Sequence, residues 1–268
     1  MKNFSFILLF FLSFQTTITS QTTASQQVTI DSLIYNTTNE FRKFWIYLPK
    51  NYQNSGKTYK TLYMHDGQNI FNKSTSYSGE WQVDEYLDKI ENDDCILIAI
   101  AHGEAHRIDE LTPFPNSKYG GGHADEYLLF LTQKVIPYIN KTYRTKTETE
   151  NTLIMGSSLG GLVSLYAGIK HQDIFGGIAS FSPSLWFSSD IFEFVKQQDI
   201  NKKLKFYFMS GGNEEASTKA NQNKMVNLLL DKGLPAPQII NKIAPMGEHN
   251  EALWAQEFPE AYNFLIQN

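Results

Sequence analysis

LIMGSSLGGLVSLYAGIK, residues 153–170, passes from an apolar, strand-like run through a cluster of glycines and serines into a pattern typical of a helix. Glycine loses more conformational freedom on folding than any other residue, so a cluster of glycines needs a structural reason. Two reasons compete here. Either a helix packs closely on a sheet, or a sharp turn exposes a reactive serine.

The pattern G-x-S-x-G favours the second reason. Residues 156–160, GSSLG, match it at the junction between the expected strand and the expected helix. Small residues two positions before and after the central serine allow a sharp turn, which would raise the Ser158 hydroxyl above the sheet. The helix start would place the backbone N–H of Leu159 where it can donate to a developing oxyanion. We therefore predict that Ser158 is a nucleophile, with simple helix–sheet packing as the alternative.

Strand-like and helix-like segments alternate along the chain, and several strands are apolar on both faces. This alternation predicts an α/β fold, a three-layer αβα sandwich with a mostly parallel central sheet and antiparallel N-terminal strands. No linker-like stretch divides residues 21–268, which we expect to form a single domain, and no connection is long enough for a cap domain. Strands are predicted within residues 28–35, 41–50, 59–67, 95–102, 151–156, 175–182, 203–212 and 235–244, and helices within 81–92, 123–143, 158–171, 188–199, 217–233 and 250–267.

A serine hydroxyl is a weak nucleophile at neutral pH and needs a base that an acidic group orients. Ligands of parallel α/β sheets bind beyond the carboxyl ends of the strands, so these groups should follow strands. His249 follows the last strand and is the candidate base; the alternative is a surface histidine at a helix N-terminus. Glu214 follows the preceding strand and is the favoured acid. Glu215 is the second choice, and a weak or missing acid is the third.

A second oxyanion donor should come from the loop after an early strand. In MHDGQNIF, residues 64–71, the backbone N–H of Gln68 is the favoured donor, with Gly67 as the alternative. Asp66 is expected to brace this loop, because a carboxylate beside an oxyanion would oppose its stabilisation.

Three further residues are candidates for substrate binding. Trp186 follows the strand after the serine-bearing helix and should lie on the rim of the site, where it could stack on an acyl group or a sugar; a core tryptophan is the alternative. Arg107 and Phe114 belong to a long loop that could form another wall. An open pocket without a cap would favour esters attached to bulky polar carriers.

The composition narrows the class of partner. A formal net charge of −5 and a pI near 5.7 argue against nucleic acid or an anionic membrane surface. Lys2, the apolar run at residues 4–14 and the polar stretch after it follow the layout of a secretory signal peptide. We therefore expect residues 1–20 to be cleaved and the protein to be secreted or periplasmic; an uncleaved anchor is the alternative. Cys95, the only cysteine, is expected to be a buried structural residue.

Several longer segments carry a family resemblance from Phe41 to Leu265. They include YMHDGQNIF (residues 63–71), NTLIMGSSLGGLVSLYAG (151–168), FGGIASFSPSLWF (175–187) and GEHNEALWAQEFPEAYNFL (247–265). Together they resemble the "putative esterase" family of α/β hydrolases, which is similar to esterase D-like enzymes. That group includes feruloyl and acetyl xylan esterases, enterochelin-type siderophore esterases and S-formylglutathione hydrolases.

The resemblance implies an α/β-hydrolase fold and a serine carboxylesterase that forms an acyl-enzyme, with Ser158 as nucleophile, His249 as base and an oxyanion amide near Gln68. Many relatives carry an aspartate at the position of the acid, where this chain offers glutamates, so a Ser–His dyad is the alternative to a triad with Glu214. No metal and no organic cofactor are expected.

The resemblance also suggests a substrate class, namely acetyl or hydroxycinnamoyl esters on carbohydrate. A siderophore esterase and an acyltransferase on the same fold are the alternatives, and a non-catalytic binding protein is a rival of a different class. The sequence leaves the oligomeric state open.

Overall fold

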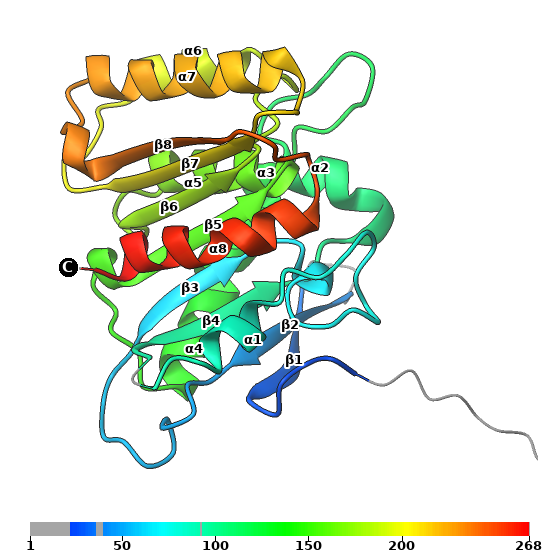
Figure 1. The fold of residues 1–268 in the computed structure, drawn as a ribbon, viewed down its shortest axis with the longest axis vertical. Coiled ribbons are helices and arrows are strands. Elements are labelled where there is room, and N and C mark those ends of the chain that lie inside the picture. Colours follow the sequence, from blue (N-terminus) through cyan, green and yellow to red (C-terminus); the bar gives the residue numbers. More distant parts are fainter. Residues whose placement is uncertain (1–21, 36–39, 92, 268) are drawn as a thin grey trace, which may run out of the picture.

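A computed structural model describes residues 22–35, 40–91 and 93–267. Within them the strands form one eight-stranded sheet in the order β1-β2-β4-β3-β5-β6-β7-β8 (Figure 1). The first strand pairs antiparallel with the second, the second pairs antiparallel with the fourth, and every other pair in the sheet is parallel. This topology confirms the predicted fold class. The signal peptide predicted for residues 1–20 lies outside the described residues.

The strands are β1 (Val28–Ile34), β2 (Phe41–Tyr47), β3 (Lys60–Met64), β4 (Cys95–Ile100), β5 (Thr152–Ser157), β6 (Gly177–Phe181), β7 (Lys205–Gly211) and β8 (Ile239–Ala244). The helices are α1 (Val83–Leu87), α2 (Arg107–Leu111), α3 (Ala124–Phe130), α4 (Ile136–Thr142), α5 (Leu159–Lys170), α6 (Asp190–Gln197), α7 (Ala216–Asp231) and α8 (Glu251–Ile266). No described helix is long and apolar enough to cross a bilayer.

Two hydrophobic cores lie on opposite faces of the sheet. One core packs α3 to α7 against it, and the other packs α1 and α8, which crosses in front of the sheet in Figure 1. The strands supply both cores by alternation: Tyr63 of β3 belongs to the first core, whereas Leu62 and Met64 belong to the second. Cys95 is buried in the second core, as predicted.

Two predicted helices differ in detail from the structure. The helix expected over residues 123–143 contains a π-helical turn at Leu131–Val135, directly before Pro137 in the first turn of α4. Proline has no N–H to donate and crowds the preceding turn, and the wider π turn accommodates it. The helix expected over residues 81–92 spans only α1. It begins later than expected because Gln82 adopts a left-handed conformation with φ of 54°, which cannot belong to the helix.

The glycine cluster serves both a sharp turn and close helix packing. A Cβ atom on Gly156 would lie 2.6 Å from the carbonyl carbon and oxygen of Gly160, so the turn itself requires glycine. A Cβ atom on Gly168 would lie 2.2 Å from Cγ1 of Ile178 in β6, so close packing of α5 on the sheet requires glycine as well. The two demands fall on different glycines of the same stretch.

Gly156→Ala should destabilise the protein by about 1–3 kcal/mol, because the new methyl group would press on backbone that cannot move aside. Urea unfolding followed by tryptophan fluorescence measures this change. Gly56→Ala is the matched control: no atom lies within 4 Å of a Cβ at that position, so its free energy of unfolding should stay within about 0.5 kcal/mol of wild type. Equal stabilities of the two variants would contradict the steric argument.

Candidate active site

Ser158 occupies the turn between β5 and α5, with φ of 56° and ψ of −120°, a backbone conformation that side chains rarely adopt. Three hydrogen bonds hold it there. Its N–H donates to the carbonyl of Phe181 at 2.9 Å, and its carbonyl accepts from the N–H groups of Leu162 and Ser184, each at 3.0 Å. The end of β6 and the first turn of α5 therefore fix the strained serine from both sides.

The acid and the histidine predicted from the sequence meet each other. Nδ1 of His249 lies 2.9 Å from Oε2 of Glu214, while Oε1 of Glu214 accepts from the hydroxyl of Ser182 and from the N–H of Gly211, each at 2.6 Å. The indole of Trp254 donates to the same Ser182 hydroxyl at 3.0 Å and packs edge-on against the imidazole. In the neutral ring Nδ1 donates to the carboxylate, which leaves Nε2 as the basic nitrogen.

The turns that carry Glu214 and His249 touch through their backbones. Gly212 N–H donates to the carbonyl of Ala244 at 2.6 Å, and Asn213 N–H donates to the carbonyl of Gly247 at 2.9 Å. A Cβ atom on Gly211 would lie 2.2 Å from that same Gly247 oxygen. Glycine at position 211 is therefore what lets the two turns come into direct contact.

Glu214 is the better placed of the two candidate acids. Its side chain is 1% exposed, and burial alone would raise its pKa. The hydrogen bonds from His249, Ser182 and Gly211 outweigh burial and hold the pKa of Glu214 below its ordinary value, so the carboxyl is ionised at neutral pH. Glu215 is exposed at the N-terminus of α7, and its carboxylate accepts a hydrogen bond from Ser217 instead.

One pocket of about 620 Å³ contains both Ser158 and His249. No hydrogen bond joins the two side chains in the described part of the chain; Oγ of Ser158 lies 3.2 Å from Oγ of Ser184 instead. The pocket is lined by Asp66, Gln68, Asn69, Thr75, Ser76, Tyr77, Ser78, His102, Glu104, Arg107, Ser157, Ser158, His249, Asn250, Glu251 and Trp254. The site is thus assembled, but the serine hydroxyl is turned toward another serine.

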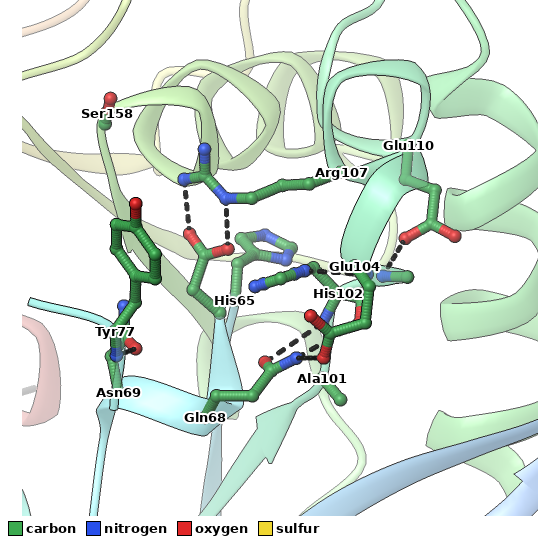
Figure 2. A network of polar contacts seen from close by, with 12 residues as sticks. His65, Gln68, Asn69, Tyr77, Ala101, His102, Glu104, Arg107, Glu110 and Ser158 are labelled. Atoms are coloured by element: carbon green, nitrogen blue, oxygen red, sulfur yellow. Dashed lines mark hydrogen bonds and ion pairs between the residues drawn. The ribbon is translucent and has the colours of Figure 1, made fainter. Parts of the chain in front are cut away.

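A bidentate ion pair lies beside Ser158 (Figure 2). Nε and Nη2 of Arg107 contact the two carboxylate oxygens of Asp66 at 2.6 and 2.8 Å. Burial would raise the pKa of Asp66, but the guanidinium holds it below its ordinary value. Asp66 was expected to brace its own loop, but its side chain pairs with Arg107 at the start of α2. Arg107 neutralises the charge that a bare carboxylate would bring to the site. Burial also lowers the pKa of the neighbouring His65 to about 4, so this imidazole is neutral.

Gln68 clamps the loop that follows β4. Its amide Nε2 donates to the carbonyl of His102 and its Oε1 accepts from the N–H of His102, both at 3.2 Å (Figure 2). A Cβ atom on Gly67 would lie 2.6 Å from the carbonyl oxygen of Ala99, so only glycine lets the turn approach the end of β4 this closely. Among the described residues, the backbone N–H groups of Gln68 and Leu159 have no hydrogen-bond partner.

The three predicted substrate-binding residues fall in different places. Arg107 lines the pocket. Trp186 is 49% exposed and packs edge-on against Tyr119, but it is not among the residues that line the pocket. Phe114 also lies outside it, where it packs against Tyr166 in the first core, so the structure corrects its placement on a pocket wall. Its ring lies against Tyr166 of α5 and Phe194 of α6.

Comparison with known protein families identifies the family of this chain. The family described as "Putative esterase" matches residues 35–265, which include every residue of the pocket. The chain belongs to this family. The esterase is also 27% identical, over 84% of its length and 92% of the relative's, to "Uncharacterized protein YbbA" of Bacillus subtilis. It is 23% identical over 81% of its length to an endo-1,4-beta-xylanase/feruloyl esterase of Xylanibacter ruminicola, and that match spans 28% of the relative.

Solved structures share the fold of the esterase. A ferulic acid esterase superposes with a TM-score of 0.68 at 16% identity and covers 89% of this chain and 96% of the other. The enterobactin esterase FES from Shigella flexneri superposes with a TM-score of 0.71 at 18% identity and covers 90% of this chain and 59% of the other. At these identities the likeness concerns the fold.

Sequence reasoning did not find Ser182, Ser184 and Trp254 as parts of the esterase's site. Ser182 and Ser184 belong to SFSPS, residues 180–184, which runs from the end of β6 into the next loop. The end of a strand beside β5, which leads to Ser158, is where such groups gather. Trp254 lies one turn into α8, just beyond His249. Position after a strand was a usable signal for the serines, whereas the orientation of the indole required coordinates.

Glu214→Gln should lower the free energy of unfolding of the esterase by about 1–3 kcal/mol at pH 7, because a buried charge-assisted hydrogen bond is lost. Since the folded-state pKa of Glu214 is depressed, this contribution is fully present above the unfolded value and fades as the pH falls below about 4. Urea unfolding between pH 3 and pH 7 measures the difference. Glu215→Gln, the exposed control, should stay within about 0.5 kcal/mol of wild type at every pH.

Proposed function

We propose that this esterase is a serine carboxylesterase in which Ser158 is the nucleophile, His249 the general base and Glu214 the orienting acid. The observation that carries the proposal is the 2.9 Å contact between His249 and Glu214 at the pocket that Ser158 enters on a strained turn. In the first step Nε2 of His249 accepts the Ser158 proton as Oγ attacks the ester carbonyl. Glu214 keeps the proton-bearing Nδ1 turned away from the substrate and stabilises the imidazolium that forms.

The contact of Ser158 with Ser184 is compatible with this chemistry. Rotation about the Cα–Cβ bond of Ser158 moves Oγ without changing the backbone, and catalytic hydrogen bonds often form only when substrate is bound. Ser184 then serves as the resting partner of the nucleophile, at 3.2 Å. The proposal requires Oγ to leave Ser184 and to face His249 in the reactive complex.

Two backbone donors support an oxyanion hole. The N–H groups of Leu159 and Gln68 lack partners among the described residues, and each belongs to a turn that glycine holds close to the sheet. We assign both to the oxyanion of the tetrahedral intermediate. His249 then protonates the leaving alcohol, and water releases the acyl group by the reverse sequence of proton transfers.

The negative charge of the pocket limits the charge of the substrate that it can bind. Three carboxyl groups, those of Asp66, Glu104 and Glu251, line it against the one guanidinium of Arg107. This excess of acid disfavours an anionic substrate such as an iron-bound tris-catecholate, and so argues against the siderophore alternative. We propose neutral acetyl or hydroxycinnamoyl esters on carbohydrate, with the exposed Trp186 as a platform near the rim. The layout of residues 1–20 supports a secreted or periplasmic location.

Ser158→Ala should lower kcat on p-nitrophenyl acetate by roughly 10⁴- to 10⁶-fold, because the covalent route is removed. A fluorophosphonate probe should label the wild type and fail to label this variant. Ser189→Ala, which changes an exposed serine at the start of α6, should keep both activity and labelling. Retained activity in Ser158→Ala would end the serine mechanism, and an unlabelled wild type would favour the binding-protein rival.

The kcat/KM for neutral esters should be about tenfold or more higher than the kcat/KM for anionic esters at low ionic strength. Added salt should reduce this ratio, because it screens the negative charge of the pocket. A panel of acetylated and feruloylated sugars, a succinylated sugar and a catecholate trilactone measures this preference. Assay with a second sugar as acceptor separates hydrolysis from acyl transfer. A preference for the anionic esters would contradict the proposed substrate class while leaving the serine mechanism intact.

A further inference from the structure

Three carboxylates gather at the start of α1, on the side of the molecule where the described chain begins. Glu80 precedes the helix, and Asp84 and Glu85 lie in its first turn. One oxygen of each lies within 4.8 Å of the oxygens of the other two. None of the three has a role in the proposed reaction or lines the pocket that contains Ser158. The proposed catalysis therefore does not explain this concentration of carboxylates.

The cluster contains carboxylate oxygens that are buried without a donor. Asp84 is 0% exposed; its Oδ2 accepts from the backbone N–H of Ser25 at 2.6 Å, whereas its Oδ1 has no partner. Oε2 of Glu85 is likewise buried and without a partner. An unpaired buried carboxylate oxygen costs free energy unless a proton or a cation compensates it. Burial accordingly raises the pKa of Asp84 to about 8.

No basic side chain among the described residues pairs directly with the cluster. In the described part of the chain, no side-chain nitrogen of Lys, Arg or His lies within 4.0 Å of the carboxylates of Glu80, Asp84 or Glu85. This distinguishes the cluster from Asp66 and Glu214, whose buried charges meet Arg107 and His249. The positive charge of Lys73 acts on Glu80 from farther away. Compensation for the buried oxygen of Asp84 therefore comes either from a proton or from a cation outside the chain.

We propose that Glu80, Asp84 and Glu85 bind a calcium ion. Calcium takes oxygen ligands at about 2.3–2.6 Å, so two ligands of one ion lie at most about 4.6–5.2 Å apart. The three oxygens of the cluster satisfy this limit, since all lie within 4.8 Å of one another. Magnesium needs near-octahedral geometry at about 2.0–2.1 Å, a stricter demand on carboxylates that come from a helix turn and the loop before it. Water completes the coordination, and Oδ1 of Asp84 gains the partner that it lacks.

The ion would join three segments of the chain. The hydroxyl of Thr23 donates to Glu80 at 2.8 Å and accepts from the N–H of Lys73 at 2.8 Å, so the first described residues, the loop before α1 and α1 itself already meet here. The same loop carries Tyr77 and Ser78, which line the pocket beside Ser158. Figure 2 shows Tyr77 and Ser158 in one view of this pocket. Calcium would thus fix one wall of the site from outside.

The test compares thermal unfolding of the purified full chain in EDTA and in about 10 mM calcium, a concentration suited to weak extracellular sites. We expect calcium to raise the Tm of the wild type by about 5 °C or more. Asp84→Asn should abolish this rise while its Tm in EDTA equals or exceeds that of the wild type, because the substitution removes like-charge repulsion. Glu193→Gln, which removes an exposed carboxylate on α6, should keep the full calcium response.

Isothermal titration of the wild type with calcium chloride gives an independent readout if Asp84→Asn does not fold, and Glu80→Gln should then weaken binding at least tenfold. An unchanged Tm in calcium together with no heat of binding would overturn the proposal and would mean that Asp84 and Glu85 share a proton instead. A larger response to magnesium than to calcium, or a calcium response that survives in Asp84→Asn, would overturn it as well.

Discussion

A single buried carboxylate joins the ends of three consecutive parallel strands. Glu214 follows β7, accepts a hydrogen bond from Ser182 just after β6, and pairs with His249 in the loop after β8. Each partner offsets part of the cost of burying the charge, and together they keep the carboxyl ionised. The order of strands in the sheet makes this possible, because β6, β7 and β8 are neighbours and deliver their loops to the same edge.

On the other side of the pocket, an ion pair neutralises the charge of a buried carboxylate. Asp66 follows β3 and would be an unfavourable neighbour for a developing oxyanion. Its bidentate pair with Arg107 cancels that charge and ties the loop after β3 to the loop after β4, where Gln68 makes a second connection. The two halves meet at Ser158, whose backbone strain is held by contacts from β6 and α5. The proposed nucleophile thus lies in the pocket that both electrostatic networks border.

The amino-acid sequence carries much of this arrangement, and the reasons are physical. The position of Ser158 in a sharp strand-to-helix turn was predictable because such a turn needs small residues at fixed positions. The position of His249 in the same pocket was predictable because topology sets its place after the last strand. Glu214 could be ranked above Glu215 by position, but contact with His249 depends on the path of a turn that no pattern encodes. Phe114 was predicted to line the pocket but packs against the first core. The sequence does not distinguish an aromatic loop residue that faces a ligand from one that packs in the core.

The backbone contact between residues 211–213 and the turn at residues 244–247 has a consequence for thermal motion. With glycine at position 211 and two main-chain hydrogen bonds between them, the two turns are in direct backbone contact and should move as one unit. A displacement of the sheet edge at β8 would move Glu214 and His249 together. The alignment of the two side chains would therefore be preserved when both turns shift. Such a displacement would change only the distance between His249 and Ser158. Binding of a substrate between these two residues could restore that distance.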